Sequence, residues 1–169
     1  MATDGTIPVG TDMGLTLGAL AMDGSHTFAA TAITTGVRQT ALLETGVYAV
    51  ATSAGVVEFA LASGMATSIA TPTGGPVGYL GVAVSEGHLW AVSSDAVVVW
   101  NTPGASAGQL VTGPQAMAGT ITAVAAHGTH VYVGGTTGVA VSHDNGATWA
   151  AAGAYSCGSG ALLTLSAGP

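Results

Sequence analysis

The sequence predicts an all-β fold, a β-propeller of four four-stranded blades with a period of about 41 residues. The first observation is a repeat of turn glycines at a spacing of 41 residues, at Gly5, Gly46, Gly87 and Gly128. A second series of large apolar residues keeps the same spacing, at Phe28, Ile69 and Leu110. Each period also contains short apolar runs separated by turn residues, and no apolar pattern of helical period and length. Four antiparallel strands in about 40 residues are typical of one propeller blade, so almost no helix is expected.

The strands of each blade are named A to D from the axis outward. Val, Ile and aromatic residues favour the strands, and Gly, Asp and Pro mark the turns between them. Strand A is expected at Ala41–Glu44, Gly81–Ser85, Thr122–Ala126 and Ala161–Ser166. Strand B is expected at Thr6–Gly10, Val47–Ala51, Leu89–Ser93 and Val131–Gly134. Strand C is expected at Leu15–Gly18, Val56–Phe59, Val97–Trp100 and Val139–Ser142, and strand D at His26–Ala30, Thr67–Ala70, Gln109–Thr112 and Ala147–Ala151.

The two ends of the chain complement each other. The first repeat begins at strand B, and the last repeat is followed by an additional strand A at Ala161–Ser166. We therefore expect the N- and C-terminal strands to share one blade, which would leave no unpaired edge there. Residues 1–169 would then form a single propeller domain. Closure within one chain would give a four-bladed ring, closure between two chains an eight-bladed ring, and the sequence leaves both open.

The chain carries very little charge. Charged residues make up 5% of the sequence, against roughly 25% in an average domain. Arg38 is the one basic residue and the net charge is −7, which excludes binding to the phosphate backbone of nucleic acids and attraction to anionic membranes. The neutral exterior is either a compositional habit of the source genome or a sign that other subunits cover it.

The remaining composition bears on the compartment. No segment reaches the roughly 18 apolar residues of a membrane span. The N-terminus lacks a basic region followed by an apolar one, so we expect synthesis in the cytoplasm without a signal peptide. Cys157 is the only cysteine, which excludes an intrachain disulfide, and its Gly-Ser surroundings predict an inert thiol.

One local motif is specific. Residues 142–149 read SHDNGATW, with Ser142, Asp144, Gly146, Thr148 and Trp149 in an S-x-D-x-G-x-T-W pattern. The motif resembles the Asp box of the BNR-repeat, sialidase-like β-propellers, and a weaker form begins at Asp23 in the first repeat. In that family the Asp-box hairpin lies away from the ligand face. The carboxylate of Asp144 is therefore expected to accept backbone N–H groups of its own turn, with Gly146 at positive φ and Trp149 packing the turn against the blade.

Several enzyme classes are disfavoured. The sialidase chemistry that the resemblance implies uses a cluster of arginines, and this chain has only Arg38. A glycosidase of another kind needs two facing carboxylates, but most acids here fall in predicted turns. The histidines, among them the pair His127 and His130, show no spacing that requires a metal site, and no cofactor-binding loop is present. We therefore expect no enzymatic activity, no metal and no cofactor.

Three functions remain. The first is a non-catalytic structural or attachment component of a larger assembly, such as a phage virion, with other protein subunits as partners. The alternative is a carbohydrate-binding, lectin-like propeller, with Tyr79, Trp90 and Trp100 as stacking platforms. Its hydrogen-bond partners for the sugar would be Asp12, Asp95 and Asn101. A second alternative is a relic or fragment of a glycosidase propeller.

Overall fold

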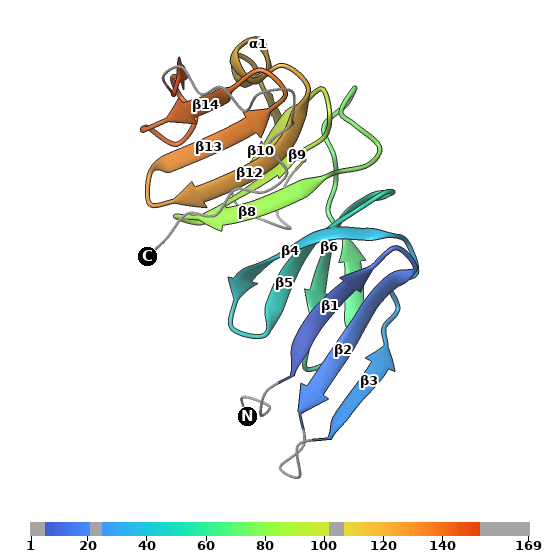
Figure 1. The fold of residues 1–169 in the computed structure, drawn as a ribbon. Coiled ribbons are helices and arrows are strands. Elements are labelled where there is room, and N and C mark those ends of the chain that lie inside the picture. The colour runs from blue at the N-terminus through green and yellow to red at the C-terminus, as the bar shows by residue number, and fades with distance from the viewer. Residues whose placement is uncertain (1–5, 21–24, 102–106, 153–169) are drawn as a thin grey trace.

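The computed structural model describes residues 6–20, 25–101 and 107–152 (Figure 1). Blade 1 contains β1 (Ile7–Thr11), β2 (Gly14–Leu20) and β3 (His26–Ala30). Blade 2 contains β4 (Val37–Glu44), β5 (Val47–Thr52), β6 (Gly55–Ala60) and β7 (Met65–Ser68). Blade 3 contains β8 (Gly81–Ser85), β9 (His88–Val92), β10 (Val97–Trp100) and β11 (Gln109–Val111). Blade 4 contains β12 (Ile121–His127), β13 (His130–Gly135), β14 (Val139–Ser142) and β15 (Ala150–Ala151).

The predicted all-β propeller architecture is confirmed. Every blade is an antiparallel sheet whose strands follow one another in sequence order. Blade 1 has three described strands, and the predicted additional strand A, Ala161–Ser166, lies outside the described residues. Gly5, Asp23 and Cys157 lie outside them as well. The sharing of one blade by the two ends of the chain therefore stays a prediction.

Some element boundaries differ from the sequence expectation. Strand β4 begins at Val37, four residues before the predicted start, and contains two register shifts against β5. Strand β15 keeps only Ala150–Ala151 of the predicted Ala147–Ala151, because the Asp-box turn occupies the residues before it. One short helix, α1 (Pro114–Ala118), lies between blades 3 and 4. Proline at its start suits a helix N-terminus, where the missing N–H has no intrahelical partner. No helix in the described part of the chain is long and apolar enough to cross a membrane.

The blades pack face to face, and the hydrophobic core lies between them in three layers. The layer between blades 1 and 2 includes Leu15 and Phe59, and the layer between blades 2 and 3 includes Tyr79 and Trp100. The layer between blades 3 and 4 includes Trp90. The innermost strands β1, β4, β8 and β12 are neighbours in that order, and Figure 1 shows blades 1 and 4 at opposite ends of the row. Burial of these apolar faces supplies the main stabilisation of the fold.

Two hydrogen bonds join β8 to the innermost hairpins of the neighbouring blades. The side-chain oxygen of Gln39 on β4 accepts the backbone N–H of Val82 on β8 at 3.2 Å. The hydroxyl of Ser85, also on β8, donates to the carbonyl oxygen of Gly128 at 2.8 Å. Blade 3 is thereby fixed to both of its neighbours close to the axis.

The B–C turns carry a repeated hydroxyl that the sequence analysis missed. Thr11, Thr52 and Ser93 are spaced by 41 residues, and each hydroxyl accepts the N–H of the residue two positions later. Thr11 and Thr52 also donate to the carbonyl oxygen three positions later, at 3.0 and 2.9 Å, whereas Ser93 donates to the carboxylate of Asp95 at 2.8 Å. Such side-chain bonds satisfy backbone groups that a tight turn leaves open. The fourth equivalent position is Gly134, so blade 4 lacks this device.

Candidate functional site

The Asp-box turn is held by its own side chains. One carboxylate oxygen of Asp144 accepts the backbone N–H of Thr148 at 2.8 Å, and the other accepts the Thr148 hydroxyl at 2.6 Å. The buried hydroxyl of Ser142 donates to Asp144 at 2.8 Å and accepts the N–H of Gly146 at 2.8 Å. Gly146 has φ +80°, a conformation that favours glycine. The carboxylate therefore closes the turn between β14 and β15.

The electrostatics of the turn follow from these bonds. Hydrogen bonds from the Thr148 hydroxyl and N–H, and then from Ser142, lower the pKa of Asp144 to about 2. All three donors favour the ionised carboxylate, because only that form accepts at both oxygens. Asp144 is solvent-exposed. Its hydrogen bonds all go to the turn, which assigns it to local structure.

The same turn packs against blade 3. The indole N–H of Trp149 donates to the carbonyl oxygen of Gly146 at 3.0 Å. The rings of Trp149 and Trp90 meet edge to face, with centroids 6.3 Å apart. A side chain at position 146 would meet Trp90, since a Cβ atom there would lie 2.4 Å from the ring. Glycine is thus required at this position both for the backbone angle and for the close approach of the two blades.

The aromatic residues expected to stack on a sugar lie inside the protein. Tyr79, Trp90 and Trp100 are each 1% exposed, and all three belong to the layers between blades. The Trp100 indole donates to the carbonyl oxygen of Ala70 at 2.8 Å, and its ring contacts Tyr79 at a centroid distance of 6.2 Å. Protein atoms therefore cover the surfaces of these rings, and none of the three presents an open ring face for stacking.

The six residues of that predicted sugar site are separated in space. Trp90 and Asn101 line a groove between blades 3 and 4. Tyr79 and Asp95 line a second pocket, between blades 2 and 3, which also contains Arg38 and Ser53. Asp12 is an exposed residue of the β1–β2 turn, and Trp100 lies in the core. In the pocket between blades 2 and 3, the carboxylate of Asp95 accepts a hydrogen bond from the hydroxyl of Ser93 at 2.8 Å.

The groove between blades 3 and 4 has a volume of about 450 Å³. Its polar lining comes from β9, the end of β10, the outer strand β11 and the Asp-box turn, and includes His88, Gln109 and Asn145. None of its described lining residues is an Asp, Glu, Lys or Arg. The sequence does not predict this groove, because Gln109 and Asn145 lie in different repeats and only the packing of the blades brings them together.

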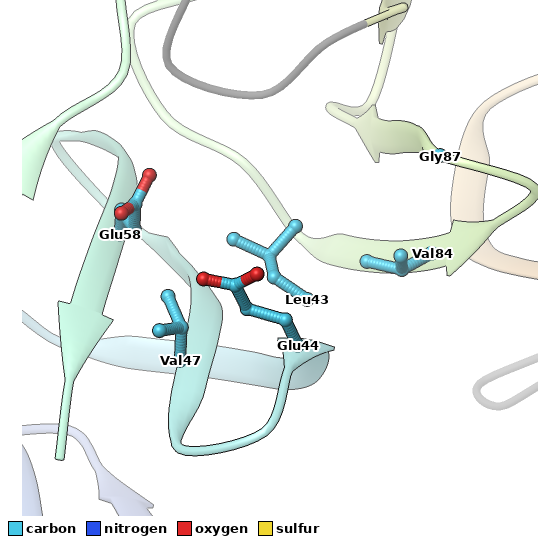
Figure 2. A pocket seen from close by; sticks show the side chains of 6 residues that line it. All are labelled: Leu43, Glu44, Val47, Glu58, Val84 and Gly87. Atoms are coloured by element: carbon cyan, nitrogen blue, oxygen red, sulfur yellow. The ribbon is translucent and has the colours of Figure 1, made fainter.

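A smaller pocket of about 210 Å³ lies between blades 2 and 3 and holds two carboxylates (Figure 2). Glu44 ends β4 and Glu58 lies on β6, while Val47 and Val84 add apolar walls. Figure 2 shows both carboxylates on the side of blade 2, with Val84 across the gap on β8. No basic side chain is present among the described lining residues. The arrangement gives a local negative charge and no partner to hold a developing anion.

The histidines form one close pair. The rings of His130 and His143 meet edge to face with centroids 4.6 Å apart. His127 is the cross-strand neighbour of His130 in the β12–β13 hairpin. Across the described residues, no group of three or more His, Cys, Asp or Glu side chains is placed to hold a metal ion.

An apolar surface at the end of the row of blades was also missed. On blade 1, the cross-strand partners Ile7, Gly18 and Phe28 lie on one face of the sheet, together with Val9. We call these four residues the apolar face of blade 1. Ile7 is 61% exposed and Phe28 is 66% exposed, while the opposite face packs against Val37 of blade 2. The other blades bury this kind of face against a neighbour, and among the described residues blade 1 has none there.

Comparison with solved structures shows a propeller fold. The chain is similar to the extracellular domain of the one-component system BT4673 from B. thetaiotaomicron, with a TM-score of 0.63 at 16% identity over 89% of this chain and 20% of that one. It is similar to YCF48 bound to D1 peptide, with a TM-score of 0.61 at 12% identity over 73% of this chain and 42% of that one. A chain of the mitotic checkpoint complex gives a TM-score of 0.64 at 15% identity, covering 85% and 45% of the two chains. This chain thus spans less than half the length of each of these structures. No protein-family model matches the sequence, and no curated protein does.

Proposed function

We propose that this chain is a non-catalytic β-propeller module that acts through protein contacts, as a structural or attachment component of a larger assembly such as a phage virion. Other protein subunits, either further copies or a scaffold, are its partners. We place its synthesis in the cytoplasm and its site of action in such a particle.

The observation that carries the proposal is the apolar face of blade 1. Ile7 and Phe28 stand on it with most of their surface in water, in a chain where only 5% of residues are charged. Contiguous exposed apolar surface on a protein marks a contact site, and a low surface charge does little to oppose association. A second sheet packed on this face would bury the two side chains, as blade 2 buries Leu15 on the other face.

The geometry supports a role without catalysis. Arg38 is the only cation of the sequence, so one copy cannot assemble the arginine cluster of the sialidase-like enzymes. The carboxylates of Glu44 and Glu58 share a pocket whose described lining offers no basic residue. The hydrogen bonds of Asp144 support placing the chain with the Asp-box propellers by structure, since that carboxylate is occupied by its own turn.

The structural neighbours are consistent with protein partners. YCF48 was solved with the D1 peptide bound, and another neighbour is part of the mitotic checkpoint complex. Identities of 12% and 15% carry the fold alone, so the partners of those proteins are not assigned to this chain.

The test is the mass of the purified protein in solution as a function of concentration, by light scattering or sedimentation. We expect self-association that is abolished by the double substitution Ile7→Thr and Phe28→Thr. Val77→Thr is the matched control, because Val77 is 80% exposed and lies in the loop before blade 3 rather than on this face.

Two results would contradict the proposal. One is a protein that stays monomeric at high concentration and hydrolyses a glycoside. The other is self-association that the double substitution leaves unchanged, since the contact would then lie elsewhere on the molecule.

A further inference from the structure

Two buried polar atoms at the groove between blades 3 and 4 have no hydrogen-bond partner. They are the indole N–H of Trp90 and the side-chain carbonyl oxygen of Asn145, and both residues line the groove. A buried polar group without a partner destabilises the fold by about 1–3 kcal/mol. Here a donor and an acceptor without partners belong to two residues that line the same cavity, although neighbouring polar groups of the same turn are satisfied.

The two residues come from different blades. Trp90 comes from β9 of blade 3, and Asn145 comes from the Asp-box turn of blade 4, where it has φ +52°. The backbone N–H of Asn145 donates to the carbonyl oxygen of Thr129 at 2.9 Å, which fixes the position of the residue. Trp90 is fixed as well, by the rings of His88 and Trp149 at 6.3 Å each. Both groups are therefore held in place before any ligand arrives.

We propose that this groove binds a neutral saccharide. A sugar hydroxyl can donate and accept at once, so adjacent hydroxyls can satisfy the Trp90 donor and the Asn145 acceptor together. The amides of Asn101 and Gln109 and the hydroxyl of Thr112 add further partners of the same neutral kind. The volume of about 450 Å³ falls within the roughly 300–1,000 Å³ of small-molecule sites.

The charges on the protein select against other ligand classes. The described lining contains no Lys or Arg to pair with an acidic sugar or a phosphate, and the net charge of −7 repels anions. A peptide added as a further strand on the outer edge of β11 would bond to main-chain groups of that strand. It would leave the open groups of Trp90 and Asn145 without partners, so the saccharide is the better match.

The three tryptophans of the chain allow a direct test by ¹H–¹⁵N NMR. The indole N–H groups of Trp100 and Trp149 are bonded to Ala70 and Gly146, whereas that of Trp90 has no partner. Titration with lactose, maltose or cellobiose at millimolar concentration should move the Trp90 indole resonance in a saturable way and leave the Trp100 resonance in place. The resonances are assigned from Trp90→Phe and Trp149→Phe variants.

The affinity test uses exposed residues that do not endanger folding. Gln109→Ala should weaken saccharide binding at least about fivefold, the effect of losing one hydrogen bond to a bound ligand. Gln115→Ala is the matched control, because Gln115 is also exposed but lies on α1 and does not line the groove. Glucuronic acid is the anionic probe, and we expect it to bind more weakly than glucose.

The proposal is wrong if none of the sugars moves the Trp90 resonance, since water then satisfies the two groups. It is also wrong if Gln109→Ala binds as tightly as the parent, or if a tetra-alanine peptide moves the resonance while the sugars do not. None of these outcomes bears on the self-association test, which depends on blade 1.

Discussion

The two phenylalanines of the chain provide a matched pair for testing how the blades are stabilised. Phe59 on β6 is fully buried at 0% exposure, in the layer with Leu15 of blade 1 and Val50 of blade 2. Phe28 on β3 is 66% exposed. The same substitution, phenylalanine to alanine, therefore removes a core contact at one site and a surface contact at the other.

The expected magnitudes follow from burial. Phe59→Ala should lower the free energy of unfolding by about 3–5 kcal/mol, because it removes a buried ring and leaves a cavity between two blades. A domain of this size has a total stability of about 5–15 kcal/mol, so the loss is a large part of it. Phe28→Ala should change the stability of the monomer by no more than about 0.5 kcal/mol.

The measurement is equilibrium unfolding in urea at a protein concentration low enough to keep the chain monomeric. With a slope of about 2 kcal/mol per molar urea, Phe59→Ala should lower the midpoint by on the order of 2 M. Similar midpoint shifts for the two variants would refute the reasoning, since the packing of blade 1 against blade 2 would then not be what buries Phe59.

Three further predictions concern single side chains. In thermal unfolding, Gly146→Ala should be about 1–3 kcal/mol more destabilising than Gly46→Ala, because both glycines have positive φ but only a Cβ at position 146 would clash with Trp90. Equal losses of stability in the two variants would contradict this prediction. Burial raises the pKa of Tyr79 to about 12, and its buried hydroxyl has no hydrogen-bond partner. Tyr79→Phe should therefore match or exceed the parent in stability at neutral pH, and should lose less stability between pH 10 and 12, where burial opposes ionisation of the folded parent. A lower melting temperature of the variant at pH 7 would contradict this prediction. Hydrogen bonds from Thr148 and Ser142 lower the pKa of Asp144 to about 2, so the stability that the ionised carboxylate contributes is present above pH 3.8 and is lost as the pH falls through 2. The difference in stability between the parent and Asp144→Asn should therefore shrink over that pH range. A constant difference would count against a role of the ionised form.

Much of the fold could be predicted from local pattern. The 41-residue spacing and the alternation of apolar runs with turn residues depend on neighbours in sequence, because strand and turn preferences are local. The S-x-D-x-G-x-T-W pattern of residues 142–149 is local in the same way, and the hydrogen bonds of Asp144 reach no further than Ser142 and Thr148.

The sequence by itself determined the repeat, the strands and the chemistry of each turn, whereas only the tertiary structure decided which faces are covered. Phe28, Ile69 and Leu110 occupy one repeat position, yet they are 66%, 6% and 45% exposed. The same applies to Trp90, which sequence reasoning placed in a sugar-stacking set and the structure places between two blades. The physical reason is that burial depends on which face of its sheet a residue occupies and on what covers that face. Ile69 lies beside Val56 on the face toward blade 3, whereas Phe28 pairs with Gly18 on a face that no described blade covers, and both conditions depend on contacts that are distant in sequence.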